Sequence, residues 1–393
     1  MSVSNEGLLL DLLSTPTAPF REDQVVVVAQ RWLERAGIAH FTDPAGNLVV
    51  GAASPRAYRA LIAARSTEPV RLFVAHMDHP GFHGQRWRAD GCLEVVWHGG
   101  SPVRHLRGAR VWIAGPEGNV AEGRLVATTL HVSGRFMAAG EVRITAWRHD
   151  GRRPAARRLF GGFAFRAPVW RAGGRIYTKA ADDLVGVFAV LSTAKRVLRQ
   201  GAVPFLGLLT RGEEVGFVGA VRHFELGWLR NPHRPLVCVS LETSRTLPGA
   251  RIGSGPVVRL GDRRTVFDPN ALRVLAGVAE RTLPGRHQRR IMDGGACEAT
   301  AATAWGVPAV GISVPLGNYH NQGFEGGPDC RGVEGPAPEF VHQDDITGLL
   351  TLCRGLMTRG LAWASPWDRD RARLSRNAAR YRTLLPAAAA GRR

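Results

Sequence analysis

The chain has few of the features that mark secreted, membrane-spanning or disulfide-rich proteins. Its five cysteines are scattered and form no Cys-x-x-Cys pair, which argues against a disulfide framework and against a structural zinc knuckle. No apolar run reaches membrane-spanning length, and the early LLLDLL run is interrupted by Asp11 with no basic leader before it. We therefore expect a soluble cytoplasmic protein with reduced thiols and no membrane partner.

Lysine is almost absent, although the net charge is +19. Only Lys179 and Lys195 are lysines, and the other basic residues are arginines spread through the whole chain, dense only at 152–158 and after Arg369. A nucleic-acid groove needs a basic stripe or an aromatic-basic signature, and neither is present. This dispersion argues against specific nucleic-acid binding.

Three common catalytic motifs are also missing. The sequence has no Gly-x-Ser-x-Gly elbow, no Walker-type phosphate loop and no nucleotide-binding glycine fingerprint after a strand. Ser254 lies in Gly-Ser-Gly, which is typical of a turn. Serine hydrolases of the elbow type, P-loop enzymes and dinucleotide enzymes are therefore disfavoured.

The order of apolar patterns predicts an α/β fold, a mixed open sheet flanked by helices. With 393 residues, 45% apolar and 22% charged, the chain is long enough for one large core and a smaller module. Helical patterns cover LLLDLL and 24–36, where Gly37 ends the second helix, and the strand RLFVA then runs into His76. Helical and strand patterns alternate again from Asp182 to about Met357.

The pattern of apolar residues changes between about Pro80 and Gly174. Short β-like runs such as LEVVW, ARVWIA and EVRITAW are separated by Gly, Pro and Asp turns, with little helical periodicity. We expect a small all-β domain inserted into the larger one. The predicted division is a discontinuous catalytic domain (1–79 and 175–365), the β insert (80–174) and an Arg/Ala-rich C-terminal tail (366–393).

Carboxylate and imidazole residues lie at the ends of separate apolar runs: His76, Asp182, the Glu213-Glu214 pair, Glu242 and His320. Imidazole nitrogen and carboxylate oxygen are the ligands that a divalent metal pair needs, and buried strands are able to bring them together. Each residue alone has an ordinary interpretation, such as a helix cap for Asp182 or a solvated acidic turn for the glutamates. Their repeated placement after apolar runs indicates a metal-dependent hydrolase.

Three acids also have expected individual roles. Asp78, two residues after His76, is placed to support the imidazole with its carboxylate. Glu213 and Glu214 follow the strand PFLGLLT and must point in different directions, so that one acid binds metal while the other acts on a water.

These residues resemble the co-catalytic di-zinc aminopeptidases of the tetrahedral and glutamyl aminopeptidase family, related to the leucyl aminopeptidase and aminoacylase/carboxypeptidase clan. The resemblance spans most of the chain up to about Met357 and rests on five motifs: His-Met-Asp at 76–78, Asp-Asp-x-x-Gly at 182–186, Glu-Glu-Val-Gly at 213–216, Gly-Gly-x-x-x-Ala at 294–299 and Pro-Leu-x-x-x-His at 315–320. The β insert also lies where that family carries a β domain.

The resemblance implies a zinc-peptidase-like catalytic domain with two divalent metal ions, Zn²⁺ first and Co²⁺ or Mn²⁺ as alternatives. One ion would be held by His76, Asp182 and Glu242, and the other by Asp182, Glu214 and His320. Glu213 would be the general base for a water bridging the two ions. The resemblance also implies a cis peptide at Asp182-Asp183 and a homo-oligomer assembled through the β domain.

The sequence departs from the family pattern at several positions. Glu242 stands where the aminopeptidases often have Asp, His79 replaces a commonly acidic residue and Glu298 takes a position usually given to Asp. Residues 321–340, rich in Gly and Pro, lengthen the segment after His320.

Three functions remain open at this point. The first is an aminopeptidase that cleaves N-terminal residues from short peptides. The second is a carboxypeptidase-type amidohydrolase of the same clan acting on N-acyl amino acids. The third is a catalytically silent scaffold that keeps the fold, although the presence of every ligand type together with Glu213 argues against it.

Overall fold

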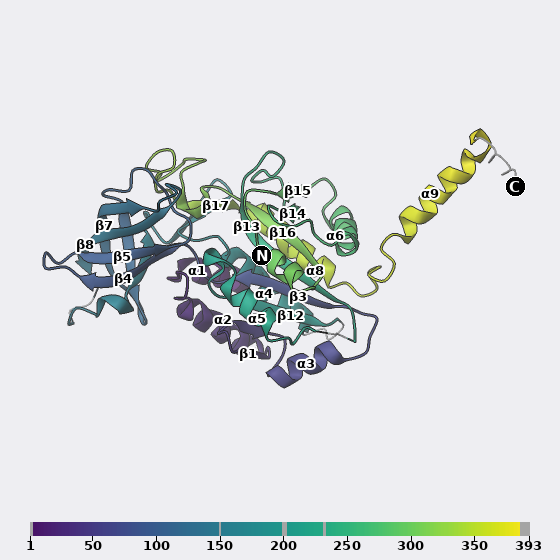
Figure 1. Ribbon diagram of the computed structural model, residues 1–393, viewed down its shortest axis with the longest axis horizontal. Coiled ribbons are helices and arrows are strands. Elements are labelled where there is room, and N and C mark those ends of the chain that lie inside the picture. The colour runs from purple at the N-terminus through teal and green to yellow at the C-terminus, as the bar shows by residue number, and fades with distance from the viewer. Residues whose placement is uncertain (1–2, 149–150, 199–202, 231–232, 386–393) are drawn as a thin grey trace, which may run out of the picture.

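The computed structural model describes residues 3–148, 151–198, 203–230 and 233–385 (Figure 1). Its centre is an eight-stranded sheet in the order β1-β2-β12-β3-β13-β16-β14-β15. The strands are β1 (His40–Thr42), β2 (Leu48–Val50), β3 (Val70–His76), β12 (Phe205–Thr210), β13 (Leu236–Arg245), β14 (Val257–Asp262), β15 (Gln288–Met292) and β16 (Ala309–Leu316). The four middle strands, β12, β3, β13 and β16, run parallel, whereas β1, β2 and β14 make antiparallel pairs.

Helices cover both faces of this sheet, because the parallel strands are apolar on both sides. One face packs against α1 (Val3–Ser14), α2 (Asp23–Ala36), α4 (Leu184–Leu198), α6 (Pro269–Thr282) and α8 (Gln343–Leu356). The opposite face packs against α3 (Pro55–Ala63), α5 (Val218–Glu225) and α7 (Glu298–Ala304). This three-layer arrangement confirms the predicted mixed open sheet flanked by helices.

A closed antiparallel barrel lies beside the main body, at the left of Figure 1. Its strands are β4 (Gly81–Trp87), β5 (Leu93–His98), β6 (Arg110–Gly115), β7 (Gly118–Leu130), β8 (Met137–Trp147) and β9 (Phe160–Phe163). Burial alternates along β5, as expected for a strand with one face in a core. The barrel interior is a separate apolar cluster that includes Phe82, Trp97 and Phe163.

A third, three-stranded sheet links the two bodies. It contains β10 (Val169–Ala172), β11 (Arg175–Thr178) and β17 (Glu339–His342), all antiparallel. Residues 321–338, which precede β17, contact the barrel side of the molecule. Asp329 accepts bonds from the guanidinium and the backbone N–H of Arg166, and Arg331 donates to the carbonyls of residues 105, 107 and 108.

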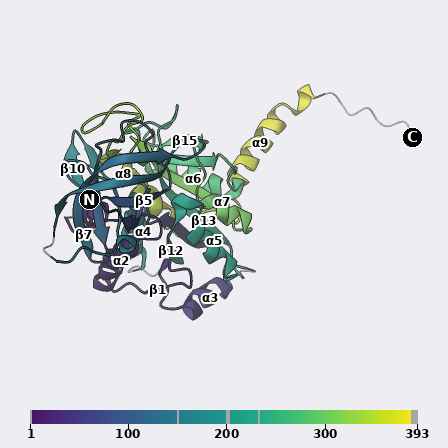
Figure 2. The same cartoon turned by 60° about the vertical axis from the view of Figure 1, so that its left-hand side comes forward.

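The last described helix, α9 (Asp368–Arg380), projects away from the body (Figures 1 and 2). Its start is tied to α6, since the Trp367 indole donates to Asn270 and Arg273 pairs with Asp370 at 2.7 Å. Part of the predicted C-terminal tail, 386–393, lies outside the described residues. Among the residues that the structure describes, no helix has the length and apolar character needed to cross a membrane.

Candidate metal centre

The ligand-type residues meet at the carboxyl ends of the central strands. His76 ends β3, Glu242 lies in β13, and Glu213 and Glu214 open a short 3-10 turn, η2 (Glu213–Val215), after β12. Asp182 lies just before α4, and His320 lies in another 3-10 turn, η3 (Tyr319–Asn321), after β16. Parallel sheets bind ligands at this edge because successive strands end there together.

Asp182 lies between the two imidazoles. Its Oδ1 is 3.5 Å from His76 Nε2, and its Oδ2 is 3.7 Å from His320 Nε2. On the far side, His320 Nε2 lies 3.0 Å from Glu214 Oε2. Donor atoms of His76, Asp182 and Glu214 all lie within 4.8 Å of one another. The two oxygens of this one carboxylate therefore face two different imidazoles.

Glu213 and Glu242 lie on the His76 side of this cluster. Glu213 Oε2 is 3.8 Å from His76 Nε2. Glu242 lines the same pocket as His76, Asp182 and Glu213. The structure therefore gathers all of the residues that the sequence singled out, with Glu213 and Glu214 directed to different imidazoles.

The chemistry of these atoms fits divalent cations. Asp182 Oδ1, Glu214 Oε1 and His320 Nε2 are all buried, and each lacks a hydrogen-bond partner. Buried polar atoms without partners are costly, and such atoms in native proteins are normally satisfied by a ligand, an ion or water. Hard carboxylate oxygens mixed with imidazole nitrogens are a donor set typical of zinc and similar metals.

The pKa shifts of the cluster also favour a positive charge beside its acids. Burial raises the pKa of Glu213 and of Glu214 well above its ordinary value, and it raises the pKa of Glu242 to about 7. Burial lowers the pKa of His320 to about 4, so this imidazole is neutral at physiological pH and has a free electron pair. Bound cations would stabilise the ionised acids.

The Asp78 carboxylate was expected to support the His76 imidazole, but its main contacts are with other groups. Its backbone carbonyl lies 3.1 Å from His76 Nδ1, whereas its carboxylate is 3.6 Å away. The carboxylate instead accepts the backbone N–H groups of Glu213 and Glu214, at 2.9 and 3.1 Å. Asp78 therefore fixes the glutamate turn as well as the histidine.

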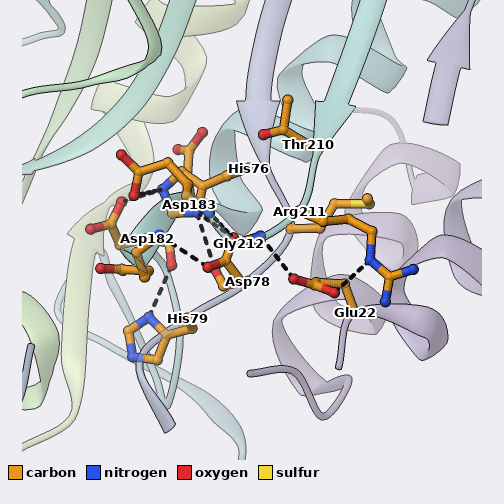
Figure 3. A network of polar contacts seen from close by, with 12 residues as sticks. Glu22, His76, Asp78, His79, Asp182, Asp183, Thr210, Arg211 and Gly212 are labelled. Carbon is orange, nitrogen blue, oxygen red and sulfur yellow. Dashed lines mark hydrogen bonds and ion pairs between the residues drawn. The ribbon is translucent and has the colours of Figure 1, made fainter. Parts of the chain in front are cut away.

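Glu22 holds the same turn from the other side, and sequence reasoning missed it. This fully buried carboxylate accepts the Gly212 N–H at 3.0 Å and pairs with the Arg211 guanidinium at 2.7 Å (Figure 3). Gly212 has a φ of +62°, which favours glycine. Because Glu22 and Gly212 are 190 positions apart, no local pattern indicates the contact.

A loop of the barrel forms one wall of the site. A Cβ atom added to Gly100 would overlap the imidazole of His320, and one added to Gly99 would lie 3.3 Å from Glu214 Cβ. The Trp97 indole donates to the Gly100 carbonyl at 2.9 Å and ties the loop to the barrel core. The β insert therefore contacts the candidate ligands directly.

Backbone contacts also surround Asp182. The Asp182-Asp183 peptide is cis, as the family resemblance implies. His79, one of the departures from the family pattern, donates from Nδ1 to the Asp182 carbonyl at 2.9 Å. Glu298, another departure, is fully buried and accepts a hydrogen bond from the Thr210 hydroxyl. His79 and Glu298 therefore both lie close to the candidate site.

The cluster opens into a pocket with about 450 Å³ of empty volume, which includes space open to solvent. Arg259 of β14 lines this pocket and is only 2% exposed. Its Nε and Nη1 have no hydrogen-bond partner, and Nη1 lies 4.0 Å from Glu242 Oε2. A buried guanidinium with free donors favours an anionic group in the pocket.

Comparison with known proteins gives a family and a set of similar folds. The family model for M42 glutamyl aminopeptidase matches residues 58–323, which is more than half of the chain. No curated protein sequence matches.

Several solved structures superpose over almost the whole chain. The Pyrococcus horikoshii TET1 peptidase, described as assembling into a tetrahedron or a large octahedral shell, is 20% identical with a TM-score of 0.69, covering 90% of this chain and 99% of its own. An aminopeptidase from Desulfurococcus kamchatkensis is 21% identical with a TM-score of 0.70, covering 92% and 96%. A TET aminopeptidase from a Thaumarchaeota archaeon is 20% identical with a TM-score of 0.69, covering 91% and 97%. At these identities the superpositions show the fold alone.

Proposed function

The chain belongs to the M42 glutamyl aminopeptidase family, and from that premise we propose that it removes N-terminal residues from short peptides with the help of two divalent cations. The observation that carries the proposal is the meeting of His76, Asp182, Glu214 and His320 with buried donor atoms left unpartnered. Zinc is the first candidate, and cobalt or manganese would suit the same donors.

The proposed ligand sets rest on the distances around Asp182 and on the pocket that Glu242 shares with it. His76, Asp182 and Glu242 would hold one cation, and Asp182, Glu214 and His320 the other, so that Asp182 serves both. When bound, the two cations supply Lewis acidity that polarises the scissile carbonyl and lowers the pKa of water. Every ligand side chain is nearly buried, which excludes competing solvent and strengthens these interactions.

Glu213 is the proposed general base. Its carboxylate lies 3.8 Å from His76 Nε2 and lines the pocket without being needed in either ligand set. It would take a proton from the attacking water as the new C–O bond forms, and then give that proton to the leaving amine as the C–N bond breaks. Asp78 and Glu22 hold the backbone of the 212–214 turn and so fix the position of this carboxylate.

Arg259 supports a preference for an acidic N-terminal residue. It lines the pocket together with the proposed ligands and has unpartnered donors in a nearly solvent-free position. A substrate carboxylate would form charge-assisted hydrogen bonds there. This preference agrees with the name of the family, which describes glutamyl substrates.

Assembly, location and domain division belong to the same proposal. We propose a homo-oligomer, since a neighbour such as the TET1 peptidase is described as forming large shells, and a cytoplasmic location. The proposed catalytic domain is 1–79 with 175–365, and the barrel strands lie within the proposed insert at 80–174. Size-exclusion chromatography with light scattering would test the assembly.

A substrate panel with metal analysis tests the function. Purified protein is stripped with a chelator, reloaded with Zn²⁺, Co²⁺ or Mn²⁺, and assayed on peptides with free or acetylated N-termini and on N-acyl amino acids. We expect about two metal ions per chain and cleavage only of peptides with a free N-terminus. Preferred cleavage of N-acyl amino acids would assign the amidohydrolase function. If the protein bound no metal and cleaved no substrate, only the scaffold function would remain.

A further inference from the structure

A fully buried glutamate outside the proposed ligand sets contacts two of the segments that carry these ligands. Glu339 begins β17 and is 0% exposed. Its Oε2 accepts the backbone N–H groups of Ala181 at 2.7 Å and Asp182 at 3.2 Å, and its Oε1 accepts the backbone N–H of His320 at 2.9 Å. A single carboxylate thus joins two ligand-bearing loops.

The fold brings Glu339 to this position by two routes. Thr178 of β11 pairs directly with Glu339 of β17, so the strand register aligns the carboxylate with the segment that leads to Asp182. From the other direction, the long segment 321–338 leaves His320 and returns to the sheet at Glu339. The contacts span 157 residues to Asp182 and 19 residues to His320.

The backbone at His320 needs such a partner. His320 has φ +55° and ψ +36°, in the left-handed region that a residue with a side chain rarely adopts. Such conformations persist where surrounding contacts enforce them. The Glu339 carboxylate holds the His320 N–H in this conformation, while the wall at Gly100 restricts the ring.

Glu339 does not line the pocket that His76, Asp182 and Glu242 line. Both of its oxygens already accept backbone N–H groups. The side chains of Asp182 and His320 instead project toward each other, with Oδ2 and Nε2 3.7 Å apart. The spacing of these two side chains depends on the backbone that Glu339 holds.

We infer that Glu339 is a positioning residue that sets the distance between the Asp182 and His320 loops, and so tunes the affinity of the site for the metal that both loops bind. This inference rests on the proposed function, because it takes Asp182 and His320 as ligands. Residues that orient metal ligands from behind typically change metal affinity or activity by about 10–100-fold when replaced.

The contact requires a carboxylate rather than an amide. Three N–H groups need two accepting oxygens, and glutamine has one oxygen and an NH₂ group that only donates. In Glu339→Gln, either the Ala181 and Asp182 bonds or the His320 bond must be lost, whichever way the amide turns. The variant keeps the size of the side chain and separates the loops without removing a ligand.

Asp345 provides a matched control. It is also fully buried, in α8, and its carboxylate accepts two backbone N–H groups, from Gly253 at 2.6 Å and Gly255 at 2.7 Å. Neither glycine is a proposed ligand. Asp345→Asn therefore removes the same kind of contact from a different part of the fold.

The experiment measures zinc affinity by competition with a chromophoric chelator, together with kcat and KM on a peptide substrate. We expect Glu339→Gln to weaken zinc binding by about 10–100-fold and to lower kcat more than it raises KM. Asp345→Asn should leave zinc affinity within about twofold of wild type even where it lowers the melting temperature, because its N–H partners hold no ligand.

The outcomes separate the inference from the proposed function. If the wild type binds zinc and cleaves peptides but folded Glu339→Gln binds zinc equally well, the inference is wrong and the function stands. If the wild type neither binds zinc nor cleaves peptides, the proposed function fails first. Should Glu339→Gln not fold, Glu339→Asp decides: it keeps two accepting oxygens on a shorter side chain, and wild-type zinc affinity in that folded variant would overturn the inference.

Discussion

The acids at the edge of the central sheet and the acids on the barrel surface have opposite environments. Glu213, Glu214 and Glu242 are nearly buried, and their pKa values are raised by burial. On the barrel, the Arg86 guanidinium lowers the pKa of Glu94, and Arg148 lowers that of Glu122. The arginine-rich chain supplies countercharge on the barrel but leaves the sheet-edge acids with little of it.

The comparison indicates which acids lower the stability of the fold. Exposed ion pairs contribute little and are easily replaced. Buried acids without partners destabilise a fold. They are typical of functional sites, where a bound positive charge stabilises them. The environment of the sheet-edge acids therefore supports the proposed metal site, whereas the barrel acids are ordinary surface residues. Four substitutions test this distinction.

The largest effect is expected at Glu213. Glu213→Gln should lower kcat by about 10²–10⁴-fold, as removal of a general base does, while zinc content stays unchanged. The metal-free variant should be about as stable as metal-free wild type, because burial raises the pKa of Glu213 and glutamine has the size of the neutral acid. Steady-state kinetics, elemental analysis and urea denaturation measure these quantities. Full retention of kcat would refute the assigned role, and the exposed Glu225→Gln serves as a control.

The next effect concerns the buried arginine. Arg259→Met should lower kcat/KM for a substrate with an N-terminal glutamate by about 10–100-fold, the range for losing a charge-assisted hydrogen bond. The kcat/KM for an N-terminal leucine should fall much less. The exposed Arg289→Met is the control. Equal losses for both substrates would show that Arg259 acts on Glu242 or on the fold rather than on the substrate.

A smaller effect is expected at the barrel wall. Gly100→Ala should push the His320 ring and weaken zinc binding by about tenfold, in the range seen when contacts that orient a metal ligand are altered. Gly115→Ala is the matched control, since its Cβ would meet Val120 at 3.6 Å and Leu159 at 4.0 Å, both ordinary contacts. Chelator competition measures both. Unchanged zinc affinity in a folded Gly100→Ala protein would mean that the wall does not position His320.

The smallest effect is expected on the barrel surface. Glu122→Gln should change the free energy of unfolding by less than about 1 kcal/mol, as for other exposed ion pairs. Because Arg148 lowers the pKa of Glu122, its contribution is present above the unfolded pKa of about 4.3 and is lost as the pH falls through the folded pKa. Urea denaturation across this range should show the difference from wild type vanish. A change in the free energy of unfolding well above about 1 kcal/mol would show that Glu122 is not an ordinary surface acid.

Much of the candidate site was predictable from local pattern. His76 ends a buried strand, His320 follows another, and the Glu213-Glu214 pair follows the strand that ends at Thr210. A residue just beyond a parallel strand has a known place at the sheet edge, so its neighbours there could be predicted without a structure. The change of periodicity after Pro80 likewise indicated the β region, although the closure of six strands into a barrel depends on register.

The residues that hold the ligands in place could not be predicted. Glu22, Glu339 and Gly100 lie far along the chain from the turns that they contact, and nothing around them in the sequence indicates the partner. Asp78 was found, but the main partners of its carboxylate were not, because those partners are backbone N–H groups. Backbone donors are present at every position, so only folding selects which of them a buried acid meets.

The sequence by itself determined the chemical identity of the site, since residue type and position after apolar runs decide which donors reach the sheet edge. Only the tertiary structure decided their geometry: which oxygen of Asp182 faces which imidazole, which buried acids hold the loops, and that a barrel loop limits His320. The physical reason is that donor type is a property of each side chain, whereas spacing arises from contacts between segments that are far apart in the chain.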